Sequence, residues 1–286
     1  MKVILDKRFY GHCPGLDRSL SFANALLNKS SSENKVIYYD VPLTHNVDAT
    51  EKLDKKGMKK IDLTDVEDGE NNYFLVSAHG ASTAKIDDLS KKNYIVQDAT
   101  CPIVNKLQRQ VVADYKAGYL VIIFGKVGHP EIEGVNGSIN HSAIVIKSFE
   151  EAKELELDKA TSIACQTTFS DEEFDQIVEY LRKKFSAIEI VVRNTVCPIV
   201  KRRVHDIVTY AKEKQVDMVV VVGSTTSSNT KLLAKKVHEV RQTIMLDNAA
   251  DLHKEDFLGA KSVLIVSGTS APPEIVEEVA DKIKTF

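Results

Sequence analysis

The chain has 286 residues, of which 43% are hydrophobic and 28% are charged, and its formal net charge is −3. These values are typical of a globular protein with two or three domains, and they give no bulk attraction to nucleic acid or to an anionic membrane. No apolar run approaches the length of a membrane-spanning helix, and charged residues follow Met1 too soon for a secretory signal. With few cysteines and no targeting segment, the sequence predicts a protein of the reducing cytoplasm that binds neither nucleic acid nor a membrane.

Short runs rich in β-branched residues alternate with amphipathic helical patterns along the whole chain. The strands predicted in this way are 3–5, 35–39, 73–77, 94–96, 120–124, 143–146, 162–165, 188–192, 218–222, 243–246 and 262–266. Helical periodicity is clear after position 101, at Ile103, Leu107 and Val111, and again after position 197. This alternation predicts the α/β class with mostly parallel sheets.

Three of the four cysteines, Cys13, Cys101 and Cys197, are each followed by proline and then by a helical pattern. Proline is favoured at the first position of a helix, so each cysteine is predicted at a helix N-terminus, where the dipole and exposed N–H groups favour the thiolate. Three thiolates from separate segments can hold one soft metal centre and leave a coordination position open for a substrate. The alternative is three buried structural cysteines, but burial does not explain why proline follows each of them.

Internal similarity indicates a threefold organisation. The segments around Cys101 and Cys197 both follow a strand and open a helix, and a looser copy surrounds Cys13. We therefore expect three α/β domains related by a pseudo-threefold axis: residues 1–97 with Cys13, residues 98–194 with Cys101, and residues 195–286 with Cys197. Each domain would bring its cysteine to the centre on a loop between strand and helix, the edge of an α/β sheet at which ligands bind.

The other unusual residues also fall on loops at predicted strand ends. His45, His79 and His129 lie on such loops, and segments rich in hydroxyl or amide groups follow the strands predicted at 162–165, 218–222 and 262–266. These groups beside helix N-termini form an anion site suited to phosphate, although any single cluster of this kind is more often a plain helix cap. Glu131 follows His129 and a proline in a glycine-bounded loop, a setting in which a carboxylic acid can be tuned to transfer protons.

Taken in order, these motifs resemble the family of 4-hydroxy-3-methylbut-2-enyl diphosphate reductases, the last enzymes of the methylerythritol phosphate route of isoprenoid biosynthesis. The resemblance spans nearly the whole chain and is carried by residues 13, 45–46, 77–80, 98–102, 128–131, 166–168, 197, 227–229 and 270–272. It implies a trefoil of three α/β domains around a central [4Fe–4S] iron–sulfur cluster with one open iron. It also implies an oxidoreductase that removes the allylic hydroxyl group of its substrate as water and gives isopentenyl and dimethylallyl diphosphates.

The resemblance also implies roles for single residues. The cluster ligands would be Cys13, Cys101 and Cys197, and the residues that bind the diphosphate substrate would be His45, His79, His129, Thr167, Thr168, Ser227, Ser228, Asn229 and Ser270. Glu131 would be the proton source, aided by His129 and by a relay through Thr167, which is preferred over Thr168. No dinucleotide-binding Gly-x-Gly-x-x-Gly segment occurs, so the electrons are expected from a separate ferredoxin or flavodoxin.

The chain departs from the family pattern at three places. Val200 replaces a hydroxyl-bearing residue, His12 precedes the first cysteine of the predicted metal site, and Cys165 is an additional thiol. One alternative is a diverged iron–sulfur reductase or dehydratase acting on another phosphorylated or hydroxylated small molecule. Another is a non-catalytic iron–sulfur redox protein in which Cys165 completes the ligand set. A zinc protein is a third, although structural zinc sites usually contain closely spaced cysteine pairs, which this sequence lacks.

Overall fold

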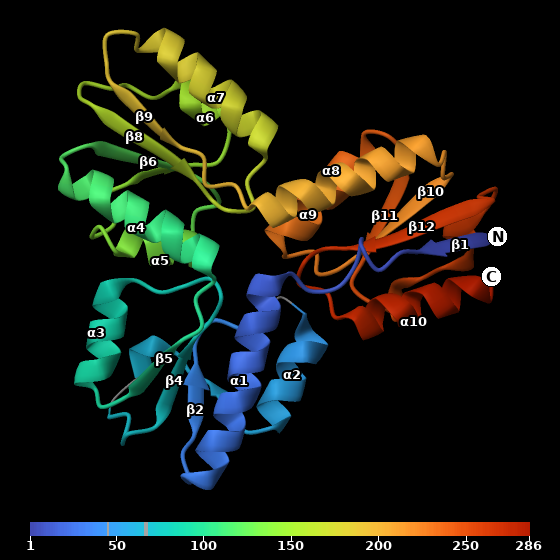
Figure 1. The fold of residues 1–286 in the computed structure, drawn as a ribbon, viewed down its shortest axis with the longest axis horizontal. Coiled ribbons are helices and arrows are strands. Elements are labelled where there is room, and N and C mark those ends of the chain that lie inside the picture. Colours follow the sequence, from blue (N-terminus) through green and yellow to red (C-terminus); the bar gives the residue numbers. More distant parts are fainter. Residues whose placement is uncertain (45, 66–67) are drawn as a thin grey trace. The chain divides into compact units, whose positions relative to one another are not determined.

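The computed structural model of the chain describes residues 1–44, 46–65 and 68–286 (Figure 1). Within these ranges the strands form three four-stranded sheets, and all neighbouring strands are parallel. The prediction of an α/β fold with three parallel sheets is therefore confirmed. His45, one of the residues predicted to bind substrate, lies outside the described residues.

Contacts within the chain divide it into two compact units. Unit 1 contains Met1–Asp17, Thr44–Glu51 and Cys197–Phe286, and unit 2 contains Arg18–Leu43 and Lys52–Val196. Of the three predicted metal ligands, Cys13 and Cys197 thus belong to unit 1, and Cys101 belongs to unit 2.

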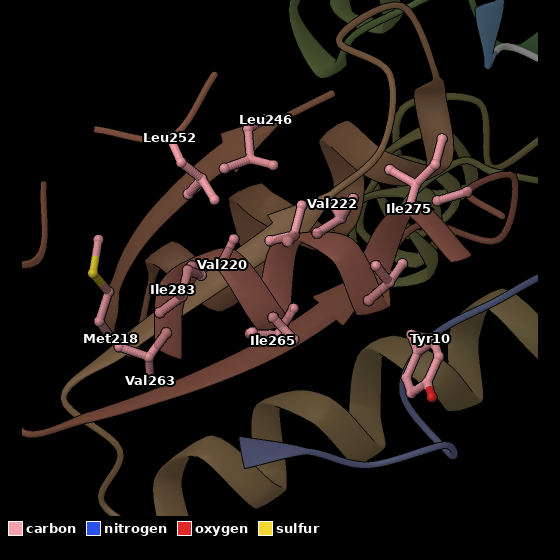
Figure 2. Packing of buried hydrophobic residues seen from close by; sticks show 14 of the residues in the cluster. Tyr10, Met218, Val220, Val222, Leu246, Leu252, Val263, Ile265, Ile275 and Ile283 are labelled. Carbon is pink, nitrogen blue, oxygen red and sulfur yellow. The ribbon is translucent and has the colours of Figure 1, made fainter. Parts of the chain in front are cut away.

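Unit 1 is built on one sheet with the strand order β1 (Lys2–Leu5), β12 (Ser262–Ser267), β10 (Met218–Val222) and β11 (Gln242–Leu246). Its helical elements are α8 (Pro198–Glu213), α9 (Ser228–His238), α10 (Pro273–Lys284), η2 (Ala249–Asp251) and η3 (Lys254–Phe257). Side chains alternate between the two faces of a strand, so Val220 packs towards α10, whereas Val219 packs towards α8 and α9. Figure 2 shows the first of these clusters, in which Val220 and Ile265 lie near Ile283 of α10. Because both faces are covered, the strands at the centre of this sheet are apolar apart from Ser262 and Ser267 at the ends of β12.

Unit 2 contains the other two sheets. The first has the order β3 (Met58–Lys60), β2 (Ile37–Tyr39), β4 (Tyr73–Val76) and β5 (Ile95–Asp98), and the second has the order β7 (Ile144–Ile146), β6 (Leu120–Phe124), β8 (Thr161–Cys165) and β9 (Ile190–Arg193). Residues of α1 (Pro14–Ser32) and α2 (Val47–Lys55) cover one face of the first sheet, and α3 (Thr83–Lys91) covers the other. On the second sheet, α6 (Phe149–Lys153) and α7 (Asp171–Lys184) lie opposite α4 (Pro102–Lys116) and α5 (Pro130–Gly137). A short 3-10 helix, η1, spans Leu63–Asp65.

Every predicted strand overlaps a strand of the structure, but the sequence does not predict β3. This strand has only three residues, two of them exposed lysines, so that Met58 alone carries its apolar pattern. It lies at the edge of its sheet, where lysines hinder pairing with another chain.

The pairing of β1 also differs from a simple division into three consecutive domains, because β1 pairs with β12 in the sheet of unit 1. The domain boundaries after residues 97 and 194 stay a prediction. A membrane-spanning helix was not expected, and none of the described helices combines the length and the apolar character that a span requires.

Candidate functional site

Each cysteine that precedes a proline stands at the start of a helix. Cys101 is the N-cap of α4 and Cys197 is the N-cap of α8, while α1 begins at Pro14 directly after Cys13. Each of the three cysteines therefore stands where a helix leaves its first backbone N–H groups without partners inside the helix. All four cysteines are among the described residues, and none of them forms a disulfide.

The chemistry of this donor set fits an iron–sulfur cluster, whose protein ligands are thiolates bound to different irons. A site for a single ion is a different arrangement, in which several side chains converge on one point. Over residues 1–44, 46–65 and 68–286, no three His, Cys, Asp or Glu side chains form such a group.

The fourth thiol lies in the apolar core of unit 2. Cys165 ends β8, is fully buried, and belongs to the same cluster as Phe124 and Phe174. Burial raises the pKa of the Cys165 thiol to about 11, so this sulfur stays protonated at neutral pH. A protonated thiol in an apolar core is a poor ligand, which argues against the alternative in which Cys165 completes a metal site.

Unit 2 brings Cys101 beside the loop of one predicted histidine, His79, whose ring contacts a second, His129. The backbone N–H of Cys101 donates to the carbonyl of Ala78 at 3.0 Å, which places Cys101 beside the loop that carries His79. The ring of His79 meets the ring of His129 edge to face, with 5.6 Å between the ring centres and 75° between the ring planes. Two histidines on loops that follow strands of different sheets in unit 2 are thus neighbours.

His129 is the N-cap of α5, and its Nδ1 accepts a hydrogen bond from the backbone N–H of Glu131 at 3.1 Å. Because a backbone N–H can only donate, Nδ1 carries no hydrogen, and Nε2 of the neutral ring must carry it. The Nε2–H group of His129 is therefore a hydrogen-bond donor at a helix N-terminus, the position that attracts anions.

Glu131 is a buried carboxyl group held by Thr167. Its side chain is 3% exposed, and Thr167 donates its backbone N–H to Oε1 at 2.6 Å and its hydroxyl to Oε2 at 2.8 Å. Burial raises the pKa of Glu131 to about 7, outweighing the two hydrogen bonds from Thr167, which lower it. Near neutral pH this carboxyl group therefore exists in both protonation states, as a proton donor requires.

Thr168 does not contact Glu131 in the same way as Thr167. Its hydroxyl accepts a hydrogen bond from Gln166 Nε2 at 3.2 Å.

Thr195 is a residue that the sequence analysis missed. Its hydroxyl accepts from the N–H of Cys165 at 3.0 Å and donates to the carbonyl of Cys165 at 2.5 Å, which fixes the end of β8 just before Gln166 and Thr167. The one signal that could have found Thr195 is its place two residues before Cys197, in a copy of the repeated motif.

Unit 1 gathers Cys13 and the predicted phosphate-binding hydroxyl groups. The backbone N–H of Cys13 donates to the carbonyl of Thr269 at 3.2 Å, and the hydroxyl of the next residue, Ser270, donates to Ser227 Oγ at 3.5 Å. Ser227 is the N-cap of α9, and Ser228 is the first residue of that helix. The backbone of the first cysteine is therefore hydrogen-bonded to Thr269, and the residue after Thr269 contacts the N-cap of α9.

Asn229 adds a buried donor to this helix N-terminus. Its side chain is 6% exposed, and its Nδ2 has no hydrogen-bond partner among the described residues. Gly268 approaches it closely, because a Cβ at Gly268 would lie 3.3 Å from Asn229 Nδ2 and 2.1 Å from Thr230 Oγ1. A buried amide without a partner is unfavourable unless a ligand accepts its hydrogen, so this corner of unit 1 fits an anion.

Two of the departures from the family pattern also lie in unit 1. Val200 lies in the first turn of α8, and its side chain is buried, with 4% of its surface exposed. His12 Nδ1 lies 3.2 Å from Asp17 Oδ1, and Arg203 donates from α8 to the carbonyl of Gly11 at 2.6 Å. Arg203 thereby ties α8 to the segment that leads into Cys13.

Comparison with known proteins gives a consistent result. The model of the LytB protein family matches residues 3–284. A protein of Pseudothermotoga lettingae named 4-hydroxy-3-methylbut-2-enyl diphosphate reductase is 33% identical over 99% of this chain and 98% of its own length. A protein of the same name from Nitratiruptor sp. is 35% identical over 99% of this chain and 98% of its own length.

Solved structures agree with the sequence comparison. The E-1-hydroxy-2-methyl-but-2-enyl-4-diphosphate reductase from Plasmodium falciparum has a TM-score of 0.88 and 27% identity, covering 98% of this chain and 87% of that one. A structure of (E)-4-hydroxy-3-methyl-but-2-enyl diphosphate reductase, described as the terminal enzyme of the non-mevalonate pathway, has a TM-score of 0.71 and 28% identity and covers 100% of both chains.

Proposed function

The chain belongs to the LytB protein family, and we propose that it is a 4-hydroxy-3-methylbut-2-enyl diphosphate reductase. In the proposed reaction the allylic C–O bond breaks, two electrons and two protons are taken up, and the products are water and isopentenyl or dimethylallyl diphosphate. The observation that carries the proposal is the buried Glu131 carboxyl, whose pKa of about 7 and contact with Thr167 suit a proton donor.

We propose Cys13, Cys101 and Cys197 as the protein ligands of a [4Fe–4S] cluster. The support is the position of each of these cysteines at a helix N-terminus, together with the membership in the LytB family. When bound, such a cluster supplies electrons and a Lewis-acidic iron with an open position.

The other proposed roles belong to the side chains of this chain. Glu131 would give a proton to the leaving oxygen, and Thr167 would hold the carboxyl group and relay the proton. His129 would donate from Nε2 to the diphosphate, as the hydrogen bond accepted by its Nδ1 requires. The remaining residues proposed to bind the substrate are His45, His79, Thr168, Ser227, Ser228, Asn229 and Ser270.

The external electron donor is proposed to be a ferredoxin or a flavodoxin, and the cytoplasmic location likewise stays a prediction. A second candidate function is favoured by one observation, the valine at position 200 in the first turn of α8. Loss of a hydroxyl group at this turn would be consistent with a diverged reductase. The phosphorylated substrate of such an enzyme would differ from 4-hydroxy-3-methylbut-2-enyl diphosphate in the part that carries the hydroxyl group.

Metal analysis of cysteine variants tests the proposed ligand set. Protein purified without oxygen is expected to contain about four irons per chain, with matching acid-labile sulfide. Cys13→Ser, Cys101→Ser and Cys197→Ser are each expected to lose the cluster, because each removes a thiolate. Cys165→Ser is the matched control and is expected to keep the iron, since its thiol is buried and protonated. Loss of iron in Cys165→Ser, or full iron content in one of the other three, would contradict the assignment.

A further inference from the structure

His79 and His129 come from two segments of unit 2 that contact each other. His79 lies on the loop after β4, whereas His129 lies after β6 and caps α5, so the two residues belong to different sheets. Their rings are 5.6 Å apart. Two donors must be held at a fixed separation if both are to bind one anion, and side chains on loops need supporting contacts for this.

Gln108 of α4 makes these contacts. Its Nε2 donates to the carbonyl of Ala81 at 2.9 Å and to the hydroxyl of Ser138 at 2.5 Å, and the hydroxyl of Ser138 donates to the carbonyl of Gly134 at 2.9 Å. Nε2 also lies 3.4 Å from the carbonyl of Gly134, so the two hydrogens of the amide NH₂ group are shared among three acceptors. One amide thus joins the loop that follows His79 to the helix that begins after His129.

Two glycines let these segments approach backbone to backbone. A Cβ at Gly134 of α5 would lie 3.3 Å from the carbonyl carbon and oxygen of Gly80 and 3.4 Å from Cα of Ala81. Gly80 has a φ of +81°, a conformation that favours glycine. A side chain at position 134 would therefore crowd the loop, and Gln108 spans the joint between the helix and the loop.

We propose that Gln108 is a positioning residue that fixes the spacing of the His79 and His129 imidazoles for one diphosphate group. This inference rests on the proposed function, since it takes the two histidines as anion donors. Gln108 acts through the backbone carbonyls of Ala81 and Gly134, which lie close along the chain to the histidines.

The position tolerates an isosteric apolar side chain, which makes a clean test. Gln108 borders a cavity of about 420 Å³ that is also lined by Thr83, Asn105 and Arg109, so methionine can be accommodated there without overpacking. Gln108→Met keeps the length of the side chain and removes both donated hydrogens. Gln110→Met is the matched control, because residues two apart on a helix do not share a face.

The test uses the full cluster-loaded chain and measures kcat, KM and the binding of inorganic diphosphate by calorimetry. Gln108→Met is expected to raise KM and the Kd for inorganic diphosphate about tenfold, while kcat, iron content and the visible spectrum change little. Gln110→Met is expected to match the parent. Ser138→Ala removes the hydroxyl that relays to Gly134 and leaves the longer direct contact of Gln108 with that carbonyl, so it is expected to raise the same Kd by a smaller factor.

A double-mutant cycle separates positioning from a general structural effect. In a His79→Ala background, Gln108→Met is expected to add little to the Kd, because the ring that it positions is gone. An equal, additive increase in that background overturns the positioning role, and so does an unchanged Kd in both Gln108→Met and Ser138→Ala. If His79→Ala itself leaves diphosphate binding intact, the anion assignment in the proposed function is wrong and the positioning role falls with it.

Discussion

Glu131 and Asp114 are both buried carboxyl groups of unit 2, yet their pKa values move in opposite directions. Burial raises the pKa of Glu131, whereas the hydrogen bonds from Arg193 are the main cause that lowers the pKa of Asp114. The first environment leaves a carboxyl group that can hold a proton at neutral pH, and the second keeps a structural carboxylate charged there. The sequence marks Glu131 only through its loop, because the burial and the Thr167 partner that tune it come from distant residues.

Glu131→Gln tests the proton donor. The variant is expected to keep its iron and to bind the diphosphate substrate, but to lose turnover by a factor of at least about 100, as for loss of a general acid. In the parent, kcat is expected to fall as the pH rises above about 7, because the ionised carboxyl has no proton to give. Glu133→Gln, an exposed position on the same helix, is the control. Turnover close to that of the parent in Glu131→Gln would remove this residue from the mechanism.

Helices and strands can be predicted where a local sequence pattern marks them, whereas contacts between distant segments cannot. The starts of α4 and α8 are predictable because proline at the first helical position is a local pattern. By contrast, β3 has too few apolar residues to be recognised, and it exists because β2 offers it a partner. The bonds of Gln108 and of Thr195 join segments far apart in the sequence, and no periodicity predicts them.

Asp114 shows how a helix is tied to its sheet. Its carboxylate on α4 accepts from Arg193 of β9 at 2.7 and 2.9 Å and from Ser162 of β8 at 2.6 Å. Asp114→Ala is expected to lower the free energy of unfolding by about 2 kcal/mol, because it leaves these donors without their acceptor while the partly exposed Arg193 is rehydrated. Chemical denaturation of the variant beside Asp175→Ala, an exposed position on α7, measures the loss.

The contribution of Asp114 to the free energy of unfolding depends on pH in a definite direction. Since the pKa of Asp114 is lowered in the folded protein, its stabilisation is present above the ordinary value of 3.8 and is lost as the pH falls through the folded pKa. The difference in unfolding free energy between the parent and Asp114→Ala should therefore shrink in acid. A difference that stays constant through that range would contradict the ion-pair account.

At the scale of the whole molecule, the sequence predicts three parallel sheets and the loops that carry the chemistry, because strand and helix patterns alternate regularly. It does not predict that β1 joins β12, since pairing between the two ends of the chain leaves no local pattern. Likewise, the predicted site residues can be named from motifs, but the contact of His79 with His129 and that of Glu131 with Thr167 are visible only in the folded unit.

Anaerobic turnover by the iron-loaded protein tests the central claim most directly. With a chemical reductant, the parent is expected to convert 4-hydroxy-3-methylbut-2-enyl diphosphate into isopentenyl and dimethylallyl diphosphates, detected by mass spectrometry. The corresponding alcohol without its diphosphate is expected to react poorly, because the proposed hydrogen-bond donors then have no anion to bind. An iron-loaded, reduced protein that leaves the diphosphate unchanged, or that reduces the bare alcohol equally well, would contradict the account.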